Sequence, residues 1–160
     1  MRLLIAAIGK LKQGPERELL AHYLGRAVAV GRKLHLSPIG VIEVAESKAA
    51  SARSRIQAEA EALLAKIPSS HRLVSLDRRG EALSSEDFAR LLAKLRDGGT
   101  EGVGFIIGGA DGLSAEVSAK ADKVISFGPL TLPHGLARIV LAEQIYRAAT
   151  ILIGHPYHRA

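Results

Sequence analysis

Residues 102–109 read GVGFIIGG, a run in which every residue is either apolar or a glycine. A run without a polar face is typical of a strand in a parallel sheet that helices cover on both sides. Similar runs occupy residues 2–9, 39–45, 71–77 and 123–128. Between the runs, helical patterns are expected at residues 15–33, 47–66, 84–97 and 114–121, and from Pro133 to about Ile153. This alternation predicts a three-layer α/β fold, with residues 1–160 forming a single domain.

Three local signals mark the ends of the predicted helices. Ser84 precedes the third helix and can cap it, with Asp87 answering from the third helical position. Pro133 suits the first turn of the last helix, and Gly154 suits its end. We therefore expect helix boundaries close to these residues.

The composition excludes several kinds of chemistry. The 160 residues are 48% hydrophobic and 24% charged, and they include no cysteine. Disulfides, thiolate nucleophiles and cysteine-ligated zinc are therefore ruled out. No stretch reaches the roughly 18–20 uncharged apolar residues that cross a bilayer. The opening MRLLIAAIGK is interpreted as a first strand rather than a signal peptide, so we expect a cytoplasmic protein without a membrane partner.

The basic charge is concentrated in the first half of the chain. Residues 1–80 contain 14 Lys and Arg against 7 Asp and Glu, whereas residues 81–160 contain 8 against 9. A basic half indicates either a polyanionic partner such as RNA or a solvated surface without a ligand. If RNA binds, the plausible phosphate contacts are Arg26, Arg32, Lys33, Arg53 and Arg55.

The last predicted helix is unusually apolar. Its sequence LARIVLAEQIYRAATILI (136–153) carries only a few polar side chains, which do not gather on one face. A helix that is apolar nearly all round must be covered on more than one side. We expect the sheet to cover one side and a second copy of the chain to cover another, which predicts a homodimer.

Two loops after predicted strands are candidate ligand sites. The first, IIGGADGL (106–113), is a glycine-rich turn, and the second, SFGPLTLPHG (126–135), leads into the last helix past His134. Ligands of open α/β sheets bind beyond the carboxyl ends of strands, where these loops are expected. Neither loop has a dinucleotide fingerprint or a P-loop motif, so on local grounds each is either a binding loop or a structural turn.

The sequence ends in GHPYHRA (154–160), which places two histidines, a tyrosine and an arginine close together. His155 and His158 could suggest a metal site with His134, but no acidic residue follows Glu143, so no metal is expected. The tail is therefore either a frayed end or a set of functional side chains.

Four segments carry a resemblance to a known family: LDRRGEALSSEDFARLL (76–92), FIIGGADGLS (105–114), TLPHGLARIVLAEQIYRA (131–148) and PYHR (156–159). In this order they resemble the RlmH family of ribosomal RNA methyltransferases, within the SPOUT superfamily. The resemblance covers essentially the whole chain. It implies a homodimeric α/β fold with a C-terminal trefoil knot.

The resemblance also implies an activity: transfer of a methyl group from S-adenosylmethionine to N3 of a pseudouridine in 23S rRNA, on assembled ribosomes. The implied cofactor-binding residues are Leu76, Gly108, Phe127, Gly128, Pro129, Leu130, Thr131 and Leu132. The implied catalytic candidates are His134, Tyr157, His158 and Arg159, with either histidine as the base.

Two other functions are compatible with the residues. One is a non-enzymatic, basic α/β protein that binds RNA or the ribosome and keeps a vestigial cofactor pocket. The other is a doubly wound nucleotide-binding protein that holds a phosphate at the GGADG turn (108–112). Neither alternative has a use for the PYHR tail.

Overall fold

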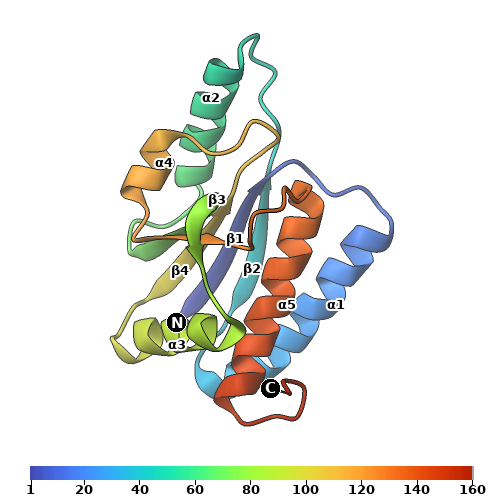
Figure 1. Ribbon diagram of the computed structural model, residues 1–160, viewed down its shortest axis with the longest axis vertical. Helices are drawn as coiled ribbons and strands as arrows, with labels where there is room; N and C mark the ends of the chain where they lie inside the picture. The colour runs from blue at the N-terminus through green and yellow to red at the C-terminus, as the bar shows by residue number, and fades with distance from the viewer. Residues whose placement is uncertain (160) are drawn as a thin grey trace.

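A computed structural model describes residues 1–159. Its five strands form one parallel sheet in the order β2-β1-β4-β3-β5 (Figure 1). The strands are β1 (Arg2–Ile8), β2 (Ile39–Val44), β3 (His71–Ala82), β4 (Gly102–Ile107) and β5 (Lys123–Ser126). The predicted α/β class is confirmed, and all five strands lie where the apolar runs predicted them.

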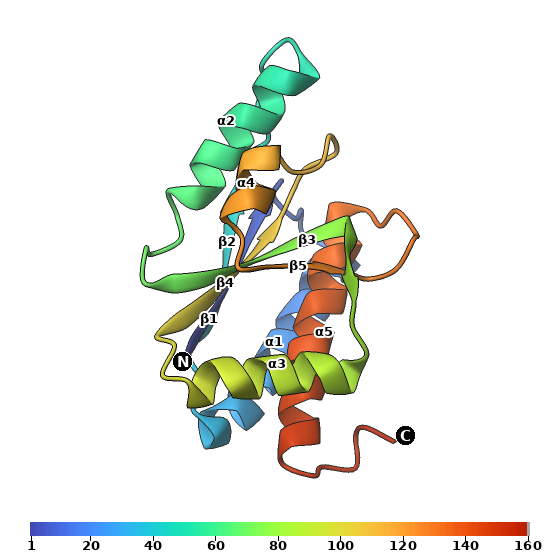
Figure 2. The ribbon, with the colours of Figure 1, turned by 60° about the vertical axis from the view of Figure 1, so that its left-hand side comes forward.

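Helices cover both faces of the sheet, as Figure 2 shows. One face carries α1 (Pro15–Gly31), α3 (Ser85–Asp97) and α5 (His134–Leu152), and the other carries α2 (Ala52–Leu64) and α4 (Ala115–Lys120). Strand β1 shows why its run has no polar face: Leu3 and Ile5 enter the core beneath α1 and α5, while Ala6 and Ile8 enter the core beneath α2 and α4. Successive strand residues point to opposite faces, so both faces must be apolar.

Local capping signals set several boundaries. Oγ of Ser84 accepts a hydrogen bond from the backbone N–H of Asp87 at 3.0 Å, which confirms the predicted start of α3. Pro133 is the cap that precedes α5 rather than its first helical residue, and Gly154 follows the helix with a φ of 66°. The helix expected from residue 47 begins only at Ala52, because Ser51 caps it by accepting a hydrogen bond from the Ser54 N–H.

Strand β3 is longer than predicted. It pairs with β4 as far as Leu76, opposite Ile107, and then continues to Ala82 alongside β5. Between Leu76 and Glu81 the register shifts, so residues 77–80 form a bulge. Gly80 permits this bulge, because a Cβ at that position would lie 2.6 Å from the carbonyl carbon of Ile125. The apolar pattern ends at residue 77, so the polar extension gave no strand signal.

The explanation offered for the apolar last helix was wrong in one respect. Helix α5 packs against α1 and α3 as well as the sheet, so most of its circumference is covered within the chain. Its residue Arg138, although charged, is fully buried. The helix alone therefore does not require a second copy. Within residues 1–159, no helix combines the length and the hydrophobicity that crossing a bilayer demands.

Candidate functional site

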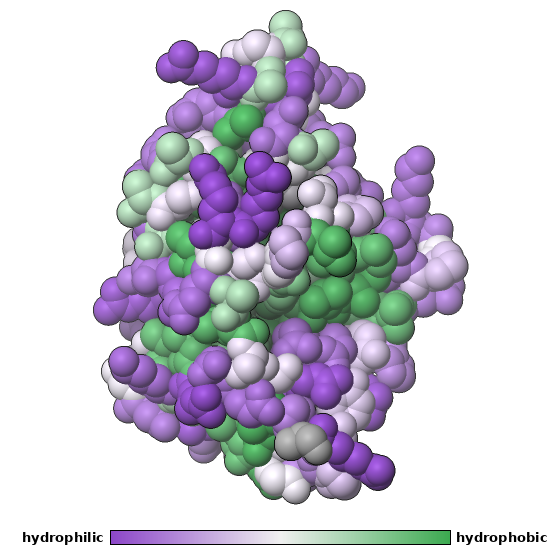
Figure 3. Space-filling model, in the orientation of Figure 1, coloured by the Kyte–Doolittle hydropathy of each residue, from purple (hydrophilic) through white to green (hydrophobic). Residues whose placement is uncertain are grey.

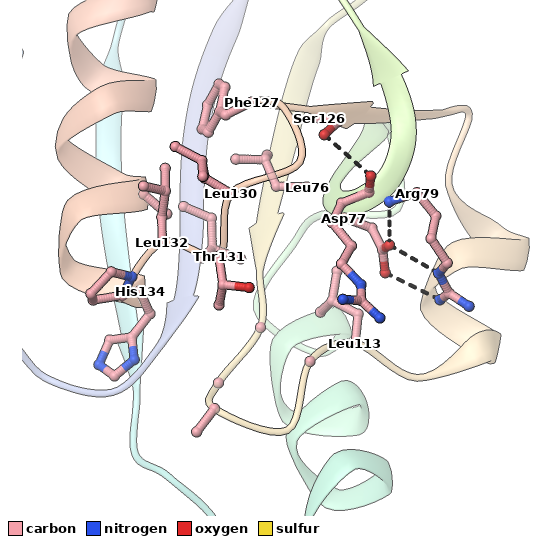
Figure 4. A pocket seen from close by; sticks show the side chains of 18 of the residues that line it. Leu76, Asp77, Arg79, Leu113, Ser126, Phe127, Leu130, Thr131, Leu132 and His134 are labelled. Atoms are coloured by element: carbon pink, nitrogen blue, oxygen red, sulfur yellow. Dashed lines mark hydrogen bonds and ion pairs between the residues drawn. The ribbon is translucent and has the colours of Figure 1, made fainter.

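A pocket of about 770 Å³ lies at the carboxyl ends of β3, β4 and β5. Three segments line it: the bulge of β3, the turn after β4, and the loop between β5 and α5 (Figure 4). The volume falls in the usual range for sites of small ligands. The two loops that were ambiguous in the sequence thus form walls of one cavity beyond the carboxyl ends of the strands, where open α/β sheets bind their ligands.

Most of the expected cofactor-binding residues line this pocket. Leu76 comes from β3, Gly108 from the turn after β4, and Phe127, Gly128, Leu130, Thr131 and Leu132 come from the last loop. Pro129, from the same loop, is not among the lining residues. Gly128 adopts a φ of 103°, and a Cβ there would meet no atom within 4 Å. Bare backbone therefore faces open space at this point, which suits close approach of a ligand.

Two acidic side chains of the pocket are neutralised by arginines. Oδ1 of Asp77 accepts hydrogen bonds from the backbone N–H of Arg79 at 2.9 Å and from its Nε at 3.1 Å (Figure 4). Asp111, in the glycine turn, accepts a hydrogen bond from Nε of Arg55 at 2.7 Å. In each case the arginine hydrogen bond holds the pKa of the carboxyl below its usual range.

A buried hydroxyl joins two walls of the pocket. Oγ of Ser126 lies 3.4 Å from the carbonyl oxygen of Arg78 and 3.1 Å from that of Gly128. The same oxygen accepts a hydrogen bond from the Gly128 N–H at 3.1 Å. Ser126 thus connects the β3 bulge to the loop that leads to α5.

His134 is the expected catalytic residue that lines the pocket. It opens α5, and its Nε2 lies 3.9 Å from Oε1 of Glu46. The turn after β1 passes close beneath it, since a Cβ on Gly9 would lie 2.8 Å from this nitrogen. One helical turn further along, Nη2 of Arg138 donates to the carbonyl oxygens of Ile8 and Gly9 at 2.7 and 2.9 Å. Arg138 therefore fixes the backbone on which His134 rests.

The tail residues lie at the other end of α5. The 19 residues of this helix span about 28 Å at ~1.5 Å per residue. Its first residue, His134, lines the pocket, whereas the C-terminus lies near its other end (Figure 1). The Tyr157 ring packs 4.5 Å from that of Tyr146, and its hydroxyl donates to Oε1 of Glu143 at 3.0 Å. Nε2 of His158 lies 2.8 Å from Oε1 of Glu86 on α3.

The tail is therefore docked on the helices of its own chain, while Arg159 is exposed. Burial and the hydrogen bond to Glu143 raise the pKa of Tyr157 to about 12. The structure does not bring Tyr157, His158 or Arg159 to the pocket of the same chain, and no group of three metal-ligating side chains occurs within residues 1–159.

The proposed phosphate contacts fall into two groups. Two are engaged within the chain: Arg26 donates to the Tyr146 hydroxyl at 2.8 Å, and Arg55 holds Asp111. The other three, Arg32, Lys33 and Arg53, are exposed. The partners of Arg26 and Arg55 lie on distant segments of the chain, so the sequence did not reveal them, and all five residues stay candidate phosphate contacts.

Apolar side chains also gather on the surface over α1 and α5, as Figure 3 shows. The larger exposed ones are Leu19 on α1 and Leu136 on α5, at 44% and 41% exposure. Leu130, at the pocket mouth, is 76% exposed. The pocket therefore opens beside an apolar surface.

Comparisons with known proteins agree with this architecture. The family model described as "Predicted SPOUT methyltransferase" matches residues 1–158. The ribosomal RNA large subunit methyltransferase H of Xanthobacter autotrophicus is 52% identical over 160 residues, and that of Rhodopseudomonas palustris is 54% identical over 160 residues. In both alignments the whole of each chain is covered.

A solved structure shares the fold. The crystal structure of a probable methyltransferase from Bordetella pertussis Tohama I matches 92% of this chain and 95% of its own, with a TM-score of 0.50 at 12% sequence identity. The similarity extends over nearly the full length of both proteins. With the sequence relationships above, the chain belongs to the SPOUT methyltransferase family, among the ribosomal RNA large subunit methyltransferases H.

Proposed function

We propose that the protein transfers a methyl group from S-adenosylmethionine to N3 of a pseudouridine in 23S rRNA, acting on assembled ribosomes. The observation that carries this proposal is the convergence of Leu76, Gly108 and residues 127–132 on one pocket in a chain of this family. The relatives are named for ribosomal RNA of the large subunit, which supports the substrate class.

The pocket suits the methyl donor. Leu76, Phe127 and Leu132 offer apolar walls for a purine ring, and the turn after β4 offers backbone groups. The volume of about 770 Å³ is ample for a nucleoside with an amino-acid side arm. When bound, the donor would supply a methyl group on a positively charged sulfur.

The remaining work is positioning and proton removal. The N3–H of pseudouridine is a weak acid, so a base must take its proton while donors stabilise charge on the neighbouring carbonyl oxygens. His134 stands at the pocket and can accept that proton. His158 is the second candidate base, Arg159 a candidate charge stabiliser and Tyr157 a candidate hydrogen-bond donor.

The tail can take part only if another copy of the chain supplies it. Its own pocket is a helix length away, so we propose a homodimer in which the tail of one copy completes the pocket of the other. The apolar surface over α1 and α5 supports such an interface. Sedimentation as a monomer at micromolar concentration would contradict it.

The fold carries a further proposal. We infer that residues 1–160 form one cytoplasmic domain with a trefoil knot near its C-terminus. The match of residues 1–158 to the SPOUT methyltransferase family model supports this proposal. The test joins the two ends of the chain covalently. It then compares the unfolding and refolding kinetics of the circular and the linear protein.

The activity is tested by transfer of radiolabelled methyl from S-adenosylmethionine to 70S ribosomes that lack the modification. We expect the wild type to label 23S rRNA and Arg159→Ala to lose nearly all activity. Equal labelling by both would remove the tail from the site. Ribosome binding without labelling by either would favour the non-enzymatic alternative.

A melting experiment distinguishes the proposed function from the nucleotide-binding alternative. S-adenosylmethionine should raise the melting temperature, because a ligand that binds only the folded state stabilises it. ATP and NAD should leave the temperature unchanged. The opposite pattern would favour a phosphate at the glycine turn.

A further inference from the structure

The bulge of β3 places an uncompensated positive charge on the pocket wall. Five residues with ionisable side chains line the pocket: Asp77, Arg78, Arg79, Asp111 and His134. Asp77 is paired with Arg79, and Asp111 with Arg55 from α2. Arg78 is exposed, and its guanidinium has no ion pair or hydrogen bond among residues 1–159. The unpaired positive charge on the pocket wall therefore belongs to Arg78.

The backbone around Arg78 is held in place on both sides. Before it, Asp77 is nearly buried, at 13% side-chain exposure, and its carboxylate binds both the backbone and the guanidinium of Arg79. After it, Gly80 lies so close to β5 that a Cβ added to it would be 2.6 Å from the carbonyl carbon of Ile125. At the position itself, the carbonyl oxygen of Arg78 lies 3.4 Å from Oγ of Ser126. The backbone at Arg78 is thus held in place, while the long side chain of Arg78 remains flexible.

In this arrangement Arg79 has a structural role, and its neighbour Arg78 is available to a ligand. Two adjacent arginines in a solvated turn would both be expected to be mobile. Here Asp77 forms an ion pair with Arg79 and thereby orients the turn that carries Arg78. We propose that Arg78 binds an anionic oxygen of a ligand at this pocket, with the Asp77–Arg79 pair as its support. The proposal rests on the proposed function for the identity of that ligand.

The oxygen has two possible sources with the same chemistry. One is the carboxylate of the methyl donor, and the other is a phosphate of the RNA at the pocket mouth. Arginine suits both because its planar guanidinium donates two parallel hydrogen bonds to carboxylate or phosphate.

The test compares Arg78→Gln with the matched control Arg2→Gln, which removes the same charge from an exposed position at the start of β1, at the end of the sheet opposite the pocket. Calorimetry measures binding of S-adenosylhomocysteine, which has the carboxylate, and of 5′-methylthioadenosine, which lacks it. Methyl transfer to 70S ribosomes at several salt concentrations measures the RNA side.

If the carboxylate is the source, Arg78→Gln should weaken S-adenosylhomocysteine binding by roughly 10-fold to 100-fold and leave 5′-methylthioadenosine binding unchanged. If an RNA phosphate is the source, both affinities should stay unchanged. The KM for ribosomes should then rise, and the slope of log binding against log salt should fall by about one. Either pattern supports the proposal.

The proposal is overturned if Arg78→Gln matches Arg2→Gln in all three measurements while the wild type is active. An inactive wild type that binds neither nucleoside would instead refute the proposed function. Asp77→Asn adds a second check, since loosening the turn should reproduce part of the Arg78→Gln defect.

Discussion

Nη1 of Arg138, on α5, lies 2.7 Å from Oε1 of Glu43, on β2. The arginine side chain is fully buried, whereas the glutamate side chain is 24% exposed. The same glutamate oxygen accepts a hydrogen bond from the Leu11 N–H at 2.9 Å. One ion pair thus joins the pocket end of α5, the edge strand and the turn after β1. Burial lowers the pKa of Arg138, and the nearby Glu43 opposes that shift.

Removing this arginine should destabilise the protein strongly. Arg138→Met leaves two carbonyl oxygens without their donor and the Glu43 carboxylate without its counter-charge, so we expect the free energy of unfolding to fall by about 3 kcal/mol. Urea denaturation measures the change. Arg32→Met, at an exposed position, serves as the control. In the double variant Arg138→Met/Glu43→Leu, part of the loss should be recovered, and a loss below 1 kcal/mol in the single variant would contradict the prediction.

Gly80→Ala should damage the pocket as well as stability. The added methyl would lie 2.6 Å from the Ile125 backbone, so the bulge or β5 must shift. We expect a loss of about 1–3 kcal/mol together with weaker binding of S-adenosylmethionine. Thermal melting with and without the donor measures both effects.

Gly25→Ala is the matched control for that experiment. Gly25 lies inside α1, and a Cβ there would meet nothing within 4 Å. This variant should gain up to about 1 kcal/mol from helix propensity. Equal melting temperatures for Gly80→Ala and Gly25→Ala would show that the bulge of β3 tolerates a side chain at this position.

Alkaline titration should reveal the docked tail. The pKa of Tyr157 is raised to about 12, so its phenol stays protonated after an unfolded tyrosine, with a pKa of about 10, has ionised. The stabilisation from this group is complete below about pH 10 and is lost as the pH rises towards 12. Ultraviolet difference spectra should show a phenol titrating at about pH 12 that disappears in Tyr157→Phe. A spectrum unchanged by this substitution would mean that the tail is undocked in solution.

Glu86→Gln should loosen the same tail, and the difference from the wild type should depend on pH. A hydrogen bond from its own backbone N–H and the contact with His158 lower the pKa of Glu86. Its contribution is therefore present above the unfolded pKa and is lost as the pH falls through the folded value. Amide exchange of residues 155–159 should be faster in Glu86→Gln than in the wild type at pH 7. The two proteins should converge at low pH, and equal exchange at pH 7 would contradict the role of this contact.

The sequence by itself determined the features that depend on near neighbours. Uniform apolar runs specify strands covered on both faces, which is why β1 and β4 lie where GVGFIIGG and its counterparts predicted. Capping by Ser84 also needs only the three residues that follow it. The position of two loops at the carboxyl ends of strands follows from the alternation of elements, whereas the prediction that Gly108 and Leu132 line one pocket came from the family resemblance.

The tertiary structure alone decided the features that depend on distant pairs. Whether α5 is covered by α1 and α3 or by a second chain is not encoded in its own periodicity. Arg55 and Asp111, Arg138 and Glu43, and Tyr157 and Tyr146 meet only after the chain has folded. Periodicity and capping act over a few residues, whereas charge pairing and burial are set by packing, which no local pattern specifies.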